Sequence, residues 1–100
     1  MSIIREFLFG FIKIHVLYHS EKKAICGVDM MKELRRHGYS VGPGTIYPIL
    51  HRMKTSGYLV TERKVQDGKV RIYYSATDRG RLALKLTKPK IRELVSEVVD

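Results

Sequence analysis

Helix-breaking residues crowd the start of an otherwise helical stretch at residues 42–53, GPGTIYPILHRM. Apolar residues in it repeat with the spacing of one helix face and predict a helix over residues 42–57 with these positions facing inward: Ile46, Ile49, Leu50 and Met53. Pro43 suits the first helical position, because the N–H that proline lacks would be unbonded there anyway. Gly44 has no side chain, so another molecule can approach the exposed N–H groups of the first turn. A helix N-terminus of this kind suits an anionic strand.

Pro48 lies inside the same predicted helix and costs it stability. Proline removes the hydrogen bond to the carbonyl of Gly44 and crowds that carbonyl. A slightly opened first turn would let Thr45 and Tyr47 splay away from the helix axis. The alternative is a turn that merely starts a core helix. That alternative gives no structural gain to offset the helix stability lost at proline.

Helical geometry sorts the remaining side chains of this stretch. With the apolar set inward, Pro48, His51 and Thr55 point outward, Thr45 and Arg52 flank one side, and Tyr47 and Lys54 flank the other. An arginine here could grip guanine or a phosphate. A tyrosine could hydrogen-bond a phosphate while its ring covers a sugar or a thymine methyl. The sequence leaves open which of these side chains reads bases.

Two β-rich runs, YLVTERKV and KVRIYYSA, surround QDGK and predict a hairpin over residues 58–76. Asp-Gly between such runs favours a tight type I′ turn at Asp67 and Gly68. This turn sets Lys64 opposite Arg71, and two like charges in these positions repel each other in isolation. A phosphate between them would make the arrangement favourable. With Lys69 beside the turn, the hairpin suits a wing along a nucleic-acid backbone, and a basic hairpin in solvent is the alternative.

Two further helices precede these elements. The first covers residues 2–19, with Ser2 placed to cap it, and residues 19–27 are predicted as a loop. The second covers residues 27–38, with Val28, Met31 and Leu34 inward and Gly38 as a left-handed stop.

A last helix is predicted over residues 77–99, capped by Thr77 and kinked or restarted at Pro89. The order is therefore helix, helix, helix, strand, strand, helix. This order describes a winged helix-turn-helix, mostly α with a β-hairpin wing, as a single domain over residues 1–100.

The positive charge of the chain is unevenly placed. The net charge is +9, and residues 34–92 hold 14 of the 19 basic residues but only 3 of the 10 acidic ones. A basic middle between near-neutral ends indicates a region that binds a polyanion. A solvated basic surface is the alternative explanation of the charge.

The first and last helices carry more apolar surface than one small core can cover. The apolar face of residues 2–19 is too broad for a helix that covers one such core, and an amphipathic stripe follows Pro89. We expect a two-fold homodimer through these helices, although the first helix could instead be central in its own domain. The expected interface residues are Phe7, Phe11, Ile14, Ile91, Leu94 and Val98.

GTIYPILHRMKTSGYL, followed by RIYYSATDRGR, resembles the PadR-like transcriptional regulators. The family pattern of Gly-Thr-(Leu/Ile)-Tyr-Pro, His-Arg, a helix-ending Gly, Tyr-Tyr and Thr-x-x-Gly-Arg falls here on Gly44, Thr45, Ile46, Tyr47, Pro48, His51, Arg52, Gly57, Tyr73, Tyr74, Thr77, Gly80 and Arg81. The match covers residues 27–86. Cys26-Gly27 replaces the Tyr-Gly that often starts the second helix, and the short segment after Pro89 resembles the compact subfamily.

The resemblance implies a dimeric winged-helix repressor that places its third helix and wing on double-stranded DNA. We therefore expect a sequence-specific transcriptional regulator, a repressor that binds a pseudo-palindromic promoter site as a homodimer. The residues expected on DNA are Ser40, Gly44, Thr45, Tyr47, Pro48, His51, Arg52, Thr55, Lys64, Lys69 and Arg71. A winged-helix module for protein–protein contact and a nonspecific architectural DNA-binding protein are the alternatives.

Known relatives sense small ligands, which raises the question of a small-molecule effector at the dimer interface. No residue here matches a ligand motif. Aromatic and aliphatic side chains at such an interface could form a pocket, but core packing explains them equally well.

An enzyme is not expected. His15 and His19 have the i, i+4 spacing of a helical metal pair, but no Glu adjoins His15 and the sequence shows no obvious third ligand. Neither a metal site nor a cofactor is therefore predicted. The single cysteine, Cys26, permits no internal disulfide, and charged residues interrupt the apolar segment 3–18, so that it is not a membrane span. We expect a cytoplasmic protein.

Overall fold

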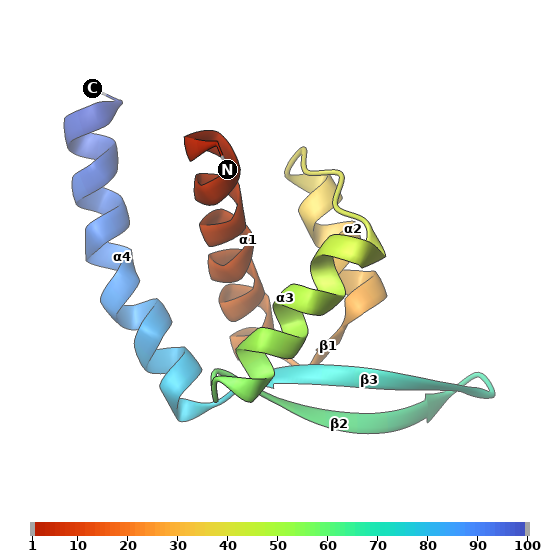
Figure 1. Cartoon of the computed structure of the whole chain (residues 1–100). Helices are drawn as coiled ribbons and strands as arrows, with labels where there is room; N and C mark the ends of the chain where they lie inside the picture. The colour runs from red at the N-terminus through yellow and green to blue at the C-terminus, as the bar shows by residue number, and fades with distance from the viewer. Residues whose placement is uncertain (1, 100) are drawn as a thin grey trace.

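The computed structural model describes residues 2–99, and these form four helices and three strands (Figure 1). The elements in chain order are α1 (Ile3–Lys22), β1 (Ile25–Cys26), α2 (Gly27–Arg36), α3 (Pro43–Thr55), β2 (Leu59–Gln66), β3 (Lys69–Ala76) and α4 (Asp78–Val98). The predicted winged-helix order of three helices, a hairpin and a last helix is confirmed. Expectations for Met1 and Asp100 lie outside the described residues.

The core forms where α1, α2 and α3 meet the base of the hairpin. Ile46, Ile49, Leu50 and Met53, the predicted inward face of α3, are all buried there. α1 begins as predicted, because the Ser2 hydroxyl accepts a hydrogen bond from the N–H of Arg5 at 3.1 Å. The buried side of α1 consists of Ile12, Val16, Leu17 and Ser20. Much of the broad apolar face of this helix therefore stays outside the core.

The prediction of a loop over residues 19–27 is wrong. α1 continues to Lys22, and Ile25 and Cys26 pair antiparallel with Tyr74 and Tyr73 of β3. A two-residue strand is too short to show an alternating pattern in the sequence. The resulting sheet has the order β1-β3-β2, so β3 is its central strand.

The inward face of α2 is rotated from the predicted one. The buried residues of this helix are Gly27, Met30 and Leu34. Val28 is 38% exposed, and Met31 is only half-buried. Gly27 lies under the ring of Tyr47, where an added Cβ would stand 2.5 Å from a ring carbon. A buried glycine adds no apolar side chain to the pattern, so the periodicity alone misplaced this face.

The predicted C-terminal signals of both middle helices are confirmed. Gly38 and Gly57 have φ values of +89° and +86°, in the left-handed region that ends a helix. After Gly38, the N–H of Tyr39 donates to the carbonyl of Leu34. α2 and α3 nevertheless end at Arg36 and Thr55, slightly before their predicted limits.

Thr77 joins the end of the hairpin to the start of α4. Its hydroxyl accepts a hydrogen bond from the N–H of Gly80 at 3.1 Å and donates one to the carbonyl of Gly57 at 2.6 Å. A Cβ at Gly80 would overlap the carbonyl oxygen of Tyr58. The family-like residues Gly57, Thr77 and Gly80 therefore build the joint between the wing and α4.

α4 runs unbroken through Pro89, so the predicted restart does not occur. Proline removes the hydrogen bond that the carbonyl of Lys85 would accept. Lys85 is exposed, and water can satisfy that carbonyl. Beyond Leu84 the helix leaves the core and extends alongside α1 to the free C-terminal end in Figure 1.

Candidate nucleic-acid interface

Four exposed residues form the outermost line of α3: Gly44, Pro48, His51 and Thr55. Their spacing of four, three and four residues places them on one face of a helix. The opposite face of α3 is the buried apolar one. This line of residues, called the α3 ridge below, is the part of the helix that a flat or grooved partner would meet first.

The N-terminal end of the α3 ridge is bare. Gly42 caps the helix without a side-chain hydrogen bond, and Pro43 follows as its first residue. A Cβ built on Gly44 would meet nothing within 4 Å. The N–H groups of Thr45 and Ile46 donate to the carbonyl of Gly42, and the Gly44 N–H has no backbone acceptor within residues 2–99. An anion can therefore approach the amide of Gly44 directly.

Pro48 does not break α3, which stays helical from Pro43 to Thr55. Because proline has no N–H, the carbonyl of Gly44 lacks its usual donor four residues later. Thr45 beside it is half-buried. Because Gly44 is exposed and has no side chain, this carbonyl stays open to solvent or to a bound donor.

Tyr47 connects α3 to the wing. Its ring covers Gly27, and the residue remains 40% exposed. It lines a groove of about 390 Å³ together with Lys69 and Arg71 of β3. Tyr74 lies at the same groove, and its burial and the neighbouring Tyr47 raise the pKa of the Tyr74 phenol.

Arg52 lies on the other side of α3. There it lines a hollow with residues of α1 and α4, such as Ile14 and Thr87. Ser40 is exposed in the segment that connects α2 and α3, ahead of the bare helix end. The predicted contact residues thus divide into the α3 ridge, a wing-side group around Tyr47, and Arg52 on the far side.

The predicted hairpin register is confirmed. Asp67 and Gly68 have φ values of 53° and 75°, as a type I′ turn requires, and Lys64 pairs with Arg71. The Lys64 ammonium stands 5.1 Å from the ring centre of Tyr73, while the Arg71 guanidinium donates to Cys26 Sγ at 3.9 Å. Each cation therefore has its own neighbour within the fold, so the hairpin does not require a phosphate between them.

The cations of the wing and α3 are not neutralised within the described chain. The ion pairs within residues 2–99 are Lys32–Asp29, Arg36–Glu33 and Arg81–Asp78, and all lie in α2 or α4. Arg63 is a further exposed wing cation, which sequence reasoning missed because it opposes Ile72 rather than another charge. A surface with unpaired positive charge attracts a polyanion.

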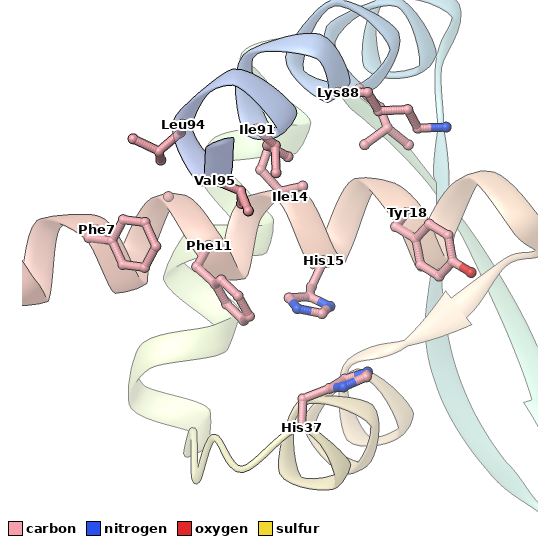
Figure 2. Close-up of a pocket in the computed structure, with 12 residues that line it drawn as sticks. Phe7, Phe11, Ile14, His15, Tyr18, His37, Lys88, Ile91, Leu94 and Val95 are labelled. Carbon is pink, nitrogen blue, oxygen red and sulfur yellow. The ribbon is translucent and has the colours of Figure 1, made fainter. Parts of the chain in front are cut away.

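An apolar groove of about 870 Å³ separates α1 from α4 (Figure 2). Five of the six residues predicted for a dimer interface line it: Phe7, Phe11, Ile14, Ile91 and Leu94. The sixth, Val98, is 70% exposed near the end of α4. The structure therefore brings five of the six predicted residues together on one face, away from the hairpin.

Three helices with a hairpin wing beside the third define the class of winged helix-turn-helix proteins. The transcriptional regulator PadR-like family matches residues 16–86. The chain belongs to this family. The transcriptional regulator Rv3488 of Mycobacterium tuberculosis is 43% identical over 96 residues, which make up 96% of this chain and 90% of that protein.

Solved structures agree with this assignment. A PadR-like transcriptional regulator from Bacillus cereus superimposes with a TM-score of 0.84 at 28% identity, covering 93% of this chain and 92% of that one. A PadR family transcriptional regulator from Eggerthella lenta gives 0.83 at 28% identity, covering 97% and 86%. The chain is a transcriptional regulator of this family, which implies DNA-binding regulation, and it is not an enzyme. No helix within residues 2–99 has the length and apolar character of a membrane span.

Proposed function

We propose that the protein is a sequence-specific repressor that binds a pseudo-palindromic promoter site as a homodimer. The observation that carries the proposal is the bare N-terminal end of the α3 ridge next to a wing with unpaired cations. A helix end where the amide of Gly44 is open and Gly44 has no side chain suits a phosphate, and the rest of the α3 ridge suits a major groove.

The contacts divide between positioning and base reading. The amide of Gly44 and the hydroxyls of Ser40 and Thr55 would bind phosphates, which fixes the register of α3 on the duplex. Thr45 and His51, on or beside the α3 ridge, are the proposed base readers, and Pro48 would pack against the groove wall.

The wing supplies a second set of backbone contacts. Lys64 and Lys69 are exposed, and Arg71 lines the groove that also contains Tyr47. These groups would bind phosphates beside the major groove, with the phenol of Tyr47 as a further donor. Arg52, on the far side of α3, would contact DNA only at a more distant phosphate.

The dimer would form through the apolar groove between α1 and α4. A second copy, related by a two-fold axis, would insert its own α4 and cover the exposed side chains there. The two α3 helices would then read half-sites about 34–36 Å apart. Promoter occlusion would repress transcription, and a small effector in the space left in the groove would alter the half-site spacing.

A binding titration tests this function. The protein is titrated against a duplex from upstream of its own gene and against a scrambled duplex, each at two salt concentrations. We expect the upstream duplex to bind at least ~10³-fold more tightly at physiological salt.

Three other results would each contradict the proposal as stated. Equal and steeply salt-dependent binding to both duplexes would indicate an architectural DNA-binding protein. No binding to either would favour a protein-interaction module. Sedimentation of a monomer at micromolar concentration would refute the dimer.

A further inference from the structure

Three histidines from two helices meet beside the apolar groove. His15 and His19 lie one turn apart on α1, and His37 follows directly after α2. One ring nitrogen of each lies within 4.8 Å of one ring nitrogen of both others. The third ligand is not visible in the sequence, because His37 joins the pair only through the packing of α2 against α1.

The rings are held in this arrangement by their neighbours. Figure 2 shows His15 on α1 and His37 at the end of α2 facing each other, and their ring centres are 4.8 Å apart. Phe11 packs on His15 at 4.3 Å and on Tyr39 at 4.6 Å, which closes one side of the cluster. His37 is exposed and leaves the cluster open to solvent.

His19 carries a polar atom that the fold leaves unsatisfied. Its Nε2 is buried and has no hydrogen-bond partner within residues 2–99. A buried polar atom without a partner destabilises a fold by about 1–3 kcal/mol. Plain aromatic packing of the three imidazoles gives no account of this nitrogen, whereas a bound cation would satisfy it.

The pKa values of His15 and His19 are also shifted in the direction that favours metal binding. Burial lowers the pKa of His15, and the neighbouring His37 and His19 lower it further. Burial likewise lowers the pKa of His19, against the opposing effect of the Glu33 carboxylate and with smaller lowering effects from His37, Arg36 and Lys22. A lowered pKa favours the neutral ring, which has the free lone pair that metal ligation requires.

We propose that His15, His19 and His37 bind one divalent transition-metal cation, with a water in the fourth position. Imidazole ligands suit Zn²⁺, Ni²⁺, Co²⁺ and Cu²⁺, whereas Mg²⁺ and Ca²⁺ require oxygen ligands. The carboxylate of Glu33 is engaged by Arg36, at 3.1 and 3.3 Å, and Cys26 is engaged by Arg71. The cluster therefore offers three nitrogens and an open position.

Binding requires the three ring nitrogens to move only slightly closer together. Tetrahedral Zn–N bonds of about 2.0–2.1 Å place ligand nitrogens about 3.4 Å apart. The three nitrogens would contract from their present limit of 4.8 Å. Side-chain rotation of the exposed His37 can provide this movement. The cation would then tie α1, which lines the apolar groove, to the end of α2, which precedes α3.

The test is a Zn²⁺ titration of the full chain after treatment with a chelator. Calorimetry gives the stoichiometry and affinity, and the same experiment with Co²⁺ gives the visible absorption of the bound ion. His37→Gln removes the exposed ligand, and His51→Gln is the matched control, since His51 is the fourth histidine of the chain and lies on the α3 ridge. Thermal unfolding without metal confirms that each variant is folded.

We expect one Zn²⁺ per chain, at micromolar affinity or tighter, and a rise in the melting temperature with Zn²⁺. His37→Gln should weaken binding by about 100-fold or more, and His51→Gln should leave it unchanged. The Co²⁺ complex should show intense visible bands of a four-coordinate ion that His37→Gln abolishes. Binding no tighter than millimolar, or equal weakening in both variants, would overturn the proposal. His15→Asn provides an independent check if His37→Gln is unfolded. Neither result bears on DNA binding, so the proposed function is tested separately.

Discussion

At the scale of single residues, glycines serve two different purposes in this chain. A Cβ on Gly27 would collide with the ring of Tyr47, whereas a Cβ on Gly44 would meet nothing. The absence of a side chain at Gly27 is thus explained by packing. At Gly44 no neighbouring side chain within the chain explains the absence of a Cβ. A glycine at such a position is expected where another molecule approaches.

Gly44→Ala tests this difference. We expect its stability to be unchanged or to rise by up to ~1 kcal/mol, because alanine is the better helix former. DNA affinity should fall at least about tenfold, which corresponds to about 1.4 kcal/mol, since the methyl group would stand where a phosphate approaches. Thermal unfolding and DNA titration of the same preparation measure both quantities.

Gly27→Ala is the matched control for stability. The new methyl group must displace the ring of Tyr47, and overpacking of this kind costs about 1–3 kcal/mol. A Gly44→Ala variant that is destabilised as strongly as Gly27→Ala, or that binds DNA normally, would contradict a phosphate at Gly44.

The residue scale also shows where sequence reasoning ends. The spacing of His15 and His19 is visible along one helix, but the approach of His37 depends on how two helices pack. Sequence periodicity identifies which residues share a face of one element. It does not identify which faces of different elements meet.

At the scale of elements, turn and cap residues predicted more of the structure than the periodicity of apolar residues did. Asp-Gly sets both the turn and the register of the hairpin, and the predicted pairing of Lys64 with Arg71 is present. The caps at Ser2 and Thr77 were predictable for the same reason, because one side chain and one nearby amide decide them. β1 and the face of α2 were not predictable, because a partner strand and a tyrosine ring from α3 decide them.

The wing is the element whose role is most directly testable. Lys64→Ala combined with Arg71→Ala should weaken binding to specific and scrambled duplexes alike. It should also lower the slope of log affinity against log salt by about one for each phosphate that the variant no longer binds. Affinities measured at several salt concentrations give this slope.

Two exposed lysines of α4 provide the control for the wing variant. Lys85→Ala combined with Lys90→Ala removes the same charge from a helix outside the proposed interface. Its slope should match that of the unmodified protein. An unchanged slope in the wing variant would remove the hairpin from the interface.

At the scale of the whole molecule, the fold is elongated, and one part of its apolar surface is not covered by other elements. Its extents are 50 × 28 × 23 Å, and α4 extends beyond the core with a row of exposed apolar residues. Such a row on a charged helix is the expected form of a surface that a second copy covers.

Leu94→Glu tests the dimer without affecting the core. Leu94 is 50% exposed and lines the groove between α1 and α4. We expect a folded monomer in sedimentation, because a charge in an apolar interface is costly to bury. Affinity for a two-half-site duplex should fall by about 10²–10⁴, since the second half-site is no longer bound by the same molecule.

Ser96→Glu introduces the same charge on α4 outside the groove. This control should sediment as the unmodified protein does and bind DNA with the same affinity. Dimeric Leu94→Glu protein would place the subunit contact elsewhere on the molecule.

The order β1-β3-β2 leaves β2 as an open edge of the sheet. Open edges are templates for sheet-to-sheet aggregation, and charged side chains along an edge strand oppose it. β2 carries Glu62, Arg63 and Lys64 in succession, all exposed. The charges of the wing therefore oppose polymerisation of the chain strand against strand.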